Sequence, residues 1–141
     1  TGTSRLRVYF TDGSIERVSA YLTPEGSLIS NTWYFILITF DRDYVAKAYI
    51  NTKILAGSAY LDISGQQGNI ENYTNLSMGR ITSSILAGKI DEPKIYHSIA
   101  SSQLINQEYY SGISNLLVNN GINHNDYIQR LSELKSNLAK Q

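Results

Sequence analysis

The sequence contains no cysteine among its 141 residues, and it has only two prolines and one tryptophan. Without cysteine it can form no disulfide, no zinc–thiolate site and no thiol nucleophile. No run of about 18 apolar residues occurs, so we expect no membrane insertion. There is also no basic-then-apolar signal segment, although a chain that begins at Thr1 gives that absence little weight.

The chain also has no excess of either charge, because twelve Lys and Arg residues balance twelve Asp and Glu residues. Nucleic-acid-binding domains usually carry a basic excess, so we expect no nucleic-acid partner. Hydrophobic residues make up 42% of the sequence, and eleven residues are tyrosine. This composition and length are typical of one domain rich in β-structure rather than of a disordered chain.

Apolar and polar residues alternate over much of the first hundred positions. Leu6, Val8 and Phe10 share one face of residues 5–10 and polar side chains share the other, which predicts a half-buried strand. The Asp-Gly pair at 12–13 predicts a tight hairpin leading to a second strand over 18–22. The apolar run 33–40 predicts a strand covered on both faces in the middle of a sheet. Further strands are expected at 45–50, 59–63, 76–80, 86–90 and 94–97.

Two helices are expected in the last third of the chain. Ser101 is a good N-cap for a short helix over 102–110, which Gly112 would end. Residues 126–139 have a helical period, with an apolar stripe at i, i+4, i+7 and i+11. This stripe would pack on its own chain or dock onto a partner. Its members are Tyr127, Leu131, Leu134 and Leu138.

Several stretches resemble laminin-G-like domains. Residues 31–41 (NTWYFILITFD) resemble a strand of that family that reads Trp, two apolar residues, then Thr-Phe-Asp. Residues 48–51 (AYIN) resemble its next strand, although Thr52 stands where glycine is usual. The closing strands resemble residues 76–80 (LSMGR) and 86–97 (LAGKIDEPKIYH), and the helix that ends the domain resembles 101–105. The match covers about residues 5–112.

This resemblance implies an all-β fold, an antiparallel concanavalin A-like jelly-roll sandwich, over residues 1–112. Residues 113–141 would then form a linker and a C-terminal amphipathic helix. Pro93 stands where the family has a β-branched residue, and it cannot donate to a ladder. The opening strands of the family have no counterpart, so the sandwich would be partial. Because an incomplete sheet exposes an edge, we expect another chain or an upstream segment to complete it.

No catalytic set is found in the sequence. His97 and His124 do not stand in a defensible Ser-His-Asp arrangement. Glucanases with this sandwich need two carboxylates facing one cleft. Asp91 and Glu92 are adjacent, so in a strand they would point to opposite faces. We therefore predict a protein that is not an enzyme, with a glycoside hydrolase-like domain as a remote alternative.

Candidate binding residues lie in polar loops. The loop over residues 64–75 has amide side chains that can bind sugar hydroxyls and an aromatic side chain on which a sugar ring can stack, and two glycosylation sequons begin in it. The resemblance also allows a calcium site at the rim of the sandwich, formed by Asp side chains and backbone carbonyls. The alternative is that each aspartate shapes its own turn. The ligand candidates are Asn69, Asn72, Tyr73 and Asn75, and the calcium candidates are Asp12, Asp41 and Asp43.

The sequence therefore predicts a non-catalytic, lectin-like binding or adhesion module of an extracellular or cell-surface protein. Its ligand would be a glycan or another protein. The alternative is a structural subunit of a virion, a phage tail or fibre, or a surface filament, with the sandwich as a building block. The missing opening strands tilt the balance slightly toward this alternative.

Overall fold

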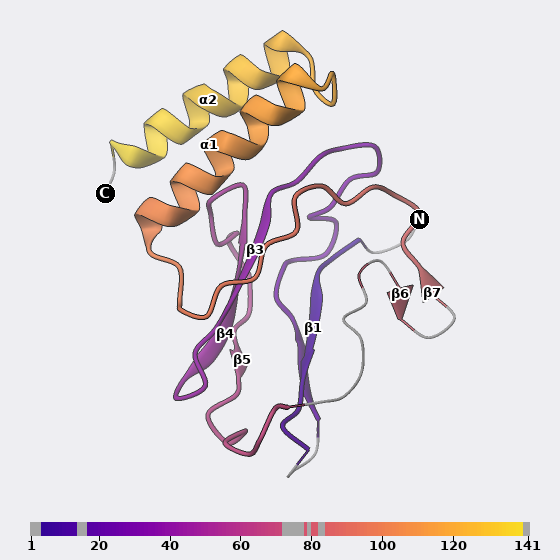
Figure 1. Cartoon of the computed structure of the whole chain (residues 1–141), viewed down its shortest axis with the longest axis vertical. Coiled ribbons are helices and arrows are strands. Elements are labelled where there is room, and N and C mark those ends of the chain that lie inside the picture. Colours follow the sequence, from indigo (N-terminus) through magenta and orange to yellow (C-terminus); the bar gives the residue numbers. More distant parts are fainter. Residues whose placement is uncertain (1–3, 14–16, 72–77, 79, 82–83, 140–141) are drawn as a thin grey trace.

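The computed structural model describes residues 4–13, 17–71, 78, 80–81 and 84–139 (Figure 1). Short strands make up the first part of this chain and two helices make up the last part. The strands are β1 (Arg7–Phe10), β2 (Val18–Tyr21), β3 (Ile36–Phe40), β4 (Val45–Ile50), β5 (Leu61–Asp62), β6 (Arg80–Ile81) and β7 (Ser84–Ile85). The helices are α1 (Ser102–Val118) and α2 (His124–Leu138).

The strands form three small antiparallel sheets. β1 pairs with β2, β4 lies between β3 and β5, and β6 pairs with β7. In the first sheet Arg7 is opposite Tyr21 and Val8 is opposite Ala20. The Leu22 N–H donates to the Leu6 carbonyl at 2.8 Å, which extends this ladder by one step.

The first apolar core lies between the β1–β2 hairpin and the sheet β3–β4–β5. The alternation expected over residues 5–10 is present, because Val8 is 5% exposed while Arg7 and Tyr9 face outward. On the facing sheet Ala46 and Ala48 are buried, and their small side chains let the two sheets approach closely. The buried members are Val8, Leu22, Ala46, Ala48, Leu61 and Ile63.

The turn after β4 has the conformation of a two-residue hairpin. Ile50 and Lys53 exchange two backbone hydrogen bonds, of 2.7 and 3.0 Å. Asn51 and Thr52 between them have φ values of 48° and 75°. Such a turn needs positive φ at both central residues, a conformation that costs a β-branched residue about 1 kcal/mol or more. Thr52 therefore adopts a positive-φ conformation that glycine, the usual residue at this position in laminin-G-like domains, adopts without strain.

The second apolar core joins the helices to the chain just before β3. Figure 1 shows α1 and α2 side by side at one end of the strands. Phe35 meets Tyr109 of α1 edge-on, with ring centroids 5.8 Å apart. The buried members of this core are Tyr109, Ile113, Ile122 and Leu134, and Trp33, Phe35, Leu116, Leu117 and Tyr127 pack against them.

A charged contact stabilises the same junction. Arg130 of α2 donates from Nε to Asp126 Oδ1 at 2.7 Å and from Nη1 to the Trp33 carbonyl at 3.1 Å. Burial alone would lower the pKa of Arg130, but its hydrogen bond to Asp126 leaves that pKa raised. The hydroxyl of Tyr109 is buried without a partner of ordinary geometry, and burial raises the pKa of Tyr109. Arg130 thus joins α2 to the segment before β3.

Residues 86–100, which we call the strap, run from β7 to α1 without regular structure (Figure 1). Among the described residues, none forms a backbone–backbone hydrogen bond with the strap. Side chains hold it on α1 instead. Lys94 Nζ lies 2.5 Å from Glu108 Oε2, and the Tyr96 hydroxyl donates to Glu108 Oε1 at 2.7 Å. The Asn115 amide donates to Glu92 Oε1 at 2.6 Å.

The all-β, jelly-roll sandwich prediction is wrong, because the described chain is a mixed fold of small sheets and two helices. The central position predicted for residues 33–40 is also wrong, since β3 is an outer strand beside β4. No strand forms over 86–90 or 94–97. Glu92 has a φ of 45°, which turns the chain, and Pro93 lacks an N–H. Part of the strand predicted over 76–80 lies outside the described residues.

The helix predictions hold in part. Ser101 caps α1 as expected, accepting the Leu104 N–H at 3.2 Å. The predicted end at Gly112 is wrong, because α1 continues to Val118. Burial of Ile113 in the helical core outweighs the low helix propensity of glycine. The C-terminal helix is confirmed over His124–Leu138, and a division of the chain at residue 112 stays a prediction. None of the helices in the described part of the chain is long and apolar enough to cross a membrane.

The contact between α2 and the second core gives a stability prediction. Leu134 is 5% exposed and Leu138 is 49% exposed, although both belong to the same helix stripe. Leu134→Ala should lower the free energy of unfolding by about 3 kcal/mol, because it leaves a cavity. Leu138→Ala should lower it by less than about 1 kcal/mol. Urea unfolding followed by Trp33 fluorescence measures both values, and equal losses would contradict the packing of α2 on α1.

The strap contact gives a pH prediction. Hydrogen bonds from Lys94 and then Tyr96 hold the pKa of Glu108 below its ordinary value of 4.5. Their contribution to stability is therefore present above that value and is lost as the pH falls through the lowered pKa. Lys94→Gln should raise the pKa of Glu108 and weaken this pH dependence, whereas Lys89→Gln, on the same strap, should change neither. The pKa of Glu108 is measured by carboxyl NMR titration in the wild-type chain, in Lys94→Gln and in Lys89→Gln. A pKa of Glu108 that Lys94→Gln does not change would show that the contact between Lys94 and Glu108 does not form.

Candidate functional site

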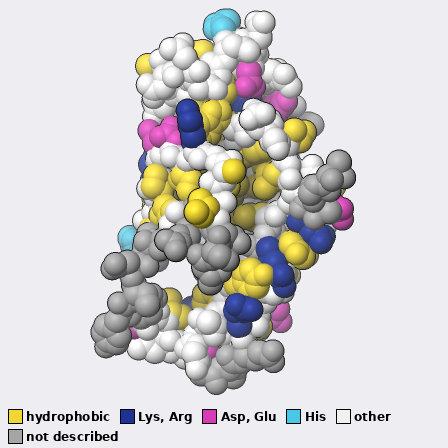
Figure 2. Space-filling model, turned by 90° about the vertical axis from the view of Figure 1, so that its right-hand side faces the viewer, with side chains coloured by type: hydrophobic (Ala, Val, Ile, Leu, Met, Phe, Trp, Pro, Cys, Tyr) yellow, Lys and Arg dark blue, Asp and Glu magenta, His cyan; other side chains and the backbone are white. Residues whose placement is uncertain are grey.

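The outer face of the β1–β2 hairpin carries alternating arginine and tyrosine side chains. The register that turns Val8 and the partly buried Ala20 toward the core turns the neighbouring residues Arg7, Tyr9 and Tyr21 away from it. Figure 2 shows a row of Lys or Arg side chains alternating with hydrophobic ones on this side of the molecule. We call this row the Arg–Tyr ladder, and its members in order are Arg17, Tyr9, Arg7, Tyr21 and Arg5.

Each guanidinium of the ladder lies over a tyrosine ring. Arg5 Cζ lies 3.6 Å from the centroid of the Tyr21 ring, and Arg7 Cζ lies 4.9 Å from it. On Tyr9 the corresponding distances are 4.5 Å from Arg7 and 4.6 Å from Arg17. Such cation–π contacts are each worth about 0.5–1 kcal/mol at an exposed site. The ladder is therefore a continuous stack in which the rings hold the guanidinium planes in place.

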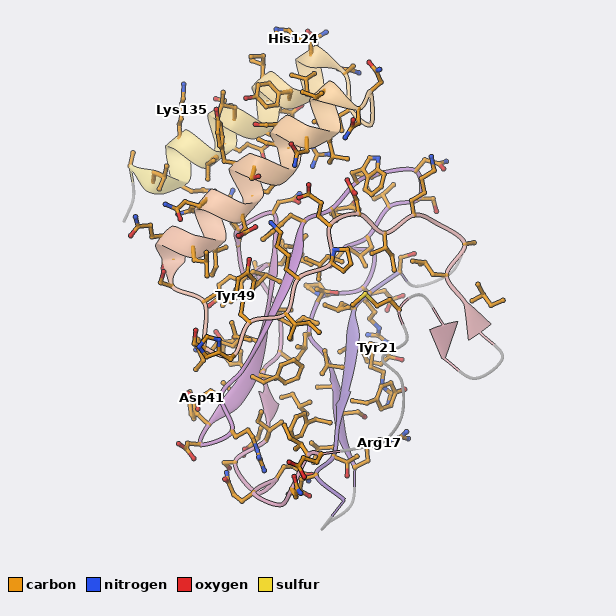
Figure 3. All side chains as sticks on the ribbon, viewed as in Figure 1. Arg17, Tyr21, Asp41, Tyr49, His124 and Lys135 are labelled. Atoms are coloured by element: carbon orange, nitrogen blue, oxygen red, sulfur yellow. The ribbon has the colours of Figure 1, made fainter. Side chains whose placement is uncertain are left out.

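The positive charge of the ladder is not neutralised by an ion pair among the described residues. Arg7 Nη2 donates to Ser19 Oγ at 3.1 Å, which is a neutral partner. The Nε of Arg5 is buried and has no acceptor. Figure 3 shows Arg17 and Tyr21 on the outer side of the hairpin, away from β3–β4–β5. The ladder thus presents three arginines that form no ion pair with the part of the chain that the structure describes, and of these Arg7 and Arg17 are exposed and Arg5 is half-buried.

The chemistry available to this face is recognition of anions. A stacked guanidinium keeps its N–H edges free to form the paired hydrogen bonds that fit carboxylate, sulfate and phosphate. Arginine does not release its proton in proteins, so the three cations of the ladder offer no acid or base for catalysis. Its geometry therefore suits binding.

A smaller cationic and aromatic group lies on the other sheet. Lys47 Nζ of β4 is 5.8 Å from the centroid of the Tyr44 ring and 5.6 Å from that of Tyr60. These distances lie near the outer limit of about 6 Å for an effective contact. With one cation against three, this group is the weaker candidate for an anion site.

The predicted calcium ligands do not form one cluster. Asp12 is buried, accepts the Gly68 N–H and is bound through its own N–H to Gln66 Oε1 at 3.0 Å. Arg42 donates to the carbonyls of Gln66 and Gly68 at 2.5–3.0 Å. Hydrogen bonds to Asp12, which follows β1, and to Arg42, which lies between β3 and β4, thus fix the position of the loop after β5. No group of three or more His, Asp or Glu residues suited to a metal occurs among the residues described.

The other two aspartates shape the turn between β3 and β4. Asp41 Oδ1 accepts the Asp43 N–H at 3.2 Å, and the Asp41 carbonyl accepts the Tyr44 N–H at 3.0 Å. Figure 3 places Asp41 at the end of these strands that is remote from the helices. Asp43 is exposed. Their contacts are those expected of aspartates that stabilise their own turn, and calcium binding stays an untested prediction.

Among the predicted ligand residues, Asn69 is described and exposed. Its side chain accepts the Glu71 N–H at 2.9 Å and donates to Glu71 Oε2 at 3.1 Å. These local bonds form a turn and leave the side chain at the surface. Asn72, Tyr73 and Asn75 lie outside the described residues.

The predicted docking stripe faces α1. Leu134 is buried, Tyr127 and Leu131 are half-buried, and Leu138 is exposed. Most of the stripe therefore packs within its own chain, on a helix rather than on the strands. Toward the end of α2 it borders an open groove of about 450 Å³, whose apolar lining is Tyr110, Leu131, Leu134 and Leu138.

The histidines and the acidic pair occupy no common site. His97 is exposed on the strap, and His124 begins α2 at the far end of the helices (Figure 3). Glu92 is held by Asn115, and Asp91 is exposed beside it. These positions do not bring together a nucleophile, a base and an orienting group.

The sequence contained part of the signal for the ladder. Arg5, Arg7 and Tyr9 alternate with buried residues, so their common outward face was predicted. The positions of Arg17 and Tyr21 depend on the cross-strand register, and the stacking of each arginine on a ring depends on side-chain rotamers. In the sequence alone, the alternation of Arg5, Arg7 and Tyr9 with apolar residues therefore indicates only the solvent-facing side of a strand.

Comparison of the chain with protein-family models, with curated proteins and with solved structures gave no match. The laminin-G-like resemblance accordingly receives no support from known proteins.

Proposed function

We propose that this chain is a non-catalytic binding module that holds an anionic ligand on the outer face of the β1–β2 hairpin. The Arg–Tyr ladder is the observation that carries the proposal. It places three arginines and two tyrosines on one exposed face, with no ion pair to neutralise them among the described residues. The adhesive role expected from the sequence, at a cell surface or outside the cell, is kept as part of the proposal.

The overall charge balance supports a specific site rather than diffuse attraction. The formal net charge is zero, so a polyanion is not drawn to the whole molecule. Binding has to depend on the local cluster of cations. Stacking on tyrosine fixes the guanidinium planes before the ligand arrives, which lowers the conformational entropy lost on binding.

The proposal predicts that binding depends on the position of the arginines and not on net charge. Arg5, Arg7 and Arg17 changed together to Gln should weaken binding of a polyanion at least about tenfold, because three exposed ion pairs are lost. The matched control is Lys53, Lys89 and Lys135 changed together to Gln, which removes the same charge from exposed positions elsewhere.

The measurement is fluorescence anisotropy at low salt with three labelled polyanions, namely polyglutamate, heparin and oligothymidylate. The wild-type chain should bind at least one of them, the control should bind it within about twofold, and binding should weaken as salt rises. Equal losses in the two triple variants, or no binding to any polyanion, would contradict the proposal.

We propose as a second candidate that the chain is a structural subunit of an assembly, with the strap as its contact surface. The strap exposes several large apolar side chains, with Ile95 76% and Ile99 56% exposed. Its backbone forms no backbone–backbone hydrogen bond with any other described residue. Contiguous exposed apolar side chains are typical of interaction surfaces.

This second candidate predicts self-association. Light scattering of the 15.8 kDa chain should give a mass that rises with concentration. Ile95→Ser with Ile99→Ser should restore a monomer. Ile29→Ser with Val118→Ser should not, although Ile29 and Val118 are 67% and 78% exposed. A wild-type monomer at every concentration would exclude this role for the strap.

A further inference from the structure

We infer that the Arg–Tyr ladder recognises an extended acidic polypeptide segment whose carboxylates stand at alternate positions. The inference rests on the proposed function, because it names the ligand class of the same site. Three observations carry it, namely the spacing of the arginines, the occupied tyrosine faces and the open surface of the hairpin.

The spacing of the arginines is that of alternate residues in an extended chain. Arg5 and Arg7 are two positions apart, or about 6.6 Å at the rise of an extended chain, with Arg7 at the start of β1 and Arg5 just before it. β1 and β2 pair from Arg7↔Tyr21 to Phe10↔Val18, and one more step of this register places Arg17 opposite Thr11. Thr11 is four residues after Arg7, so Arg17 lies about 13 Å beyond Arg7 along the strand direction. Side chains on one face of an extended peptide recur with the same two-residue period. Carboxylates at i, i+2 and i+6 can therefore meet all three guanidiniums without a change of period.

The tyrosine rings are already stacked on guanidiniums. Four Arg–Tyr contacts, with Cζ 3.6–4.9 Å from the ring centroids, occupy the faces of Tyr9 and Tyr21. Unpaired bases bind largely by stacking on open aromatic faces, and aromatic platforms serve sugar rings in the same way. A carboxylate needs only the N–H edges of the guanidinium. The ladder therefore disfavours binding by stacking of bases or sugar rings. Among anions that bind through the N–H edges alone, the two-residue spacing of the arginines favours the carboxylates of an extended peptide.

The surface itself suits an extended ligand. Tyr9 and Tyr21 are 42% and 40% exposed, and Ser19, which lies opposite Tyr9 on β2, has a small side chain. The ladder spans roughly 20 Å from the level of Arg5 to that of Arg17, or six residues of strand. A chain of about seven residues would cover this length.

The experiment compares two blocked, fluorescein-labelled eight-residue peptides of the same composition, four Glu and four Ser. One has Glu at positions 1, 3, 5 and 7, and the other has Glu at positions 1 to 4. All four carboxylates of the first share one face, whereas only two of the second do. The first reaches one more arginine, so it should bind about two- to fivefold more tightly at low salt.

Arg17→Gln should abolish the difference between the two peptides, because it removes the arginine that only the alternating peptide reaches. Lys89→Gln should leave the difference unchanged. Circular dichroism and Trp33 fluorescence establish that both variants are folded. Retention of the difference in Arg17→Gln would overturn the inference.

Binding of heparin and oligothymidylate, measured beside the two peptides, distinguishes failure of the acidic-peptide inference from failure of the proposed anion-binding function. If the two peptides bind equally, or if heparin or oligothymidylate binds while neither peptide does, the acidic-peptide inference is wrong and the anion-binding function stands. If none of the four ligands binds, both fail. Preference for the alternating peptide, lost on Arg17→Gln, supports both.

Discussion

The packing of the β1–β2 hairpin on Ala46 and Ala48 is the contact on which the arrangement of the strands and of their outer face depends. Alanine at these two positions of β4 leaves room for Val8 to be buried between the sheets. Because side chains alternate along a strand, burial of Val8 on one face fixes Arg7 and Tyr9 on the other. A shift of one residue would bury the arginines and expose the core. The apolar packing therefore determines which face can bind a ligand.

The helices and the strap depend less on this contact than on the second core. Phe35 and Arg130 join the helical hairpin to the chain before β3. The strap is held on α1 by Glu108, which accepts from Lys94 and Tyr96. These polar contacts leave the apolar side chains of the strap exposed. The two surfaces that we propose for partners are therefore separate, one cationic on the hairpin and one apolar on the strap.

Local features of the fold were predictable from the sequence, whereas its global arrangement was not. The alternation around Val8 predicted β1, and the stripe ending at Leu138 predicted α2, because each reports a periodicity within one element. Residues 86–97 have a strand-like pattern, but a strand needs a partner, and Glu92 and Pro93 interrupt the backbone. The jelly-roll prediction assumed such partners. The ladder was half predictable, since Arg17 and Tyr21 come into place only through pairing.

Measurement of the register between β1 and β2 tests most directly whether the arginines and tyrosines of the hairpin share its outer face. NMR measurement of cross-strand contacts should pair Arg7 with Tyr21 and Val8 with Ala20, with Val8 methyl contacts to Ala46 or Ala48. That result would place the arginines and tyrosines together on the outer face. Pairing displaced by one residue, or Val8 methyl groups in contact with solvent, would contradict the account and remove the basis for the Arg–Tyr ladder.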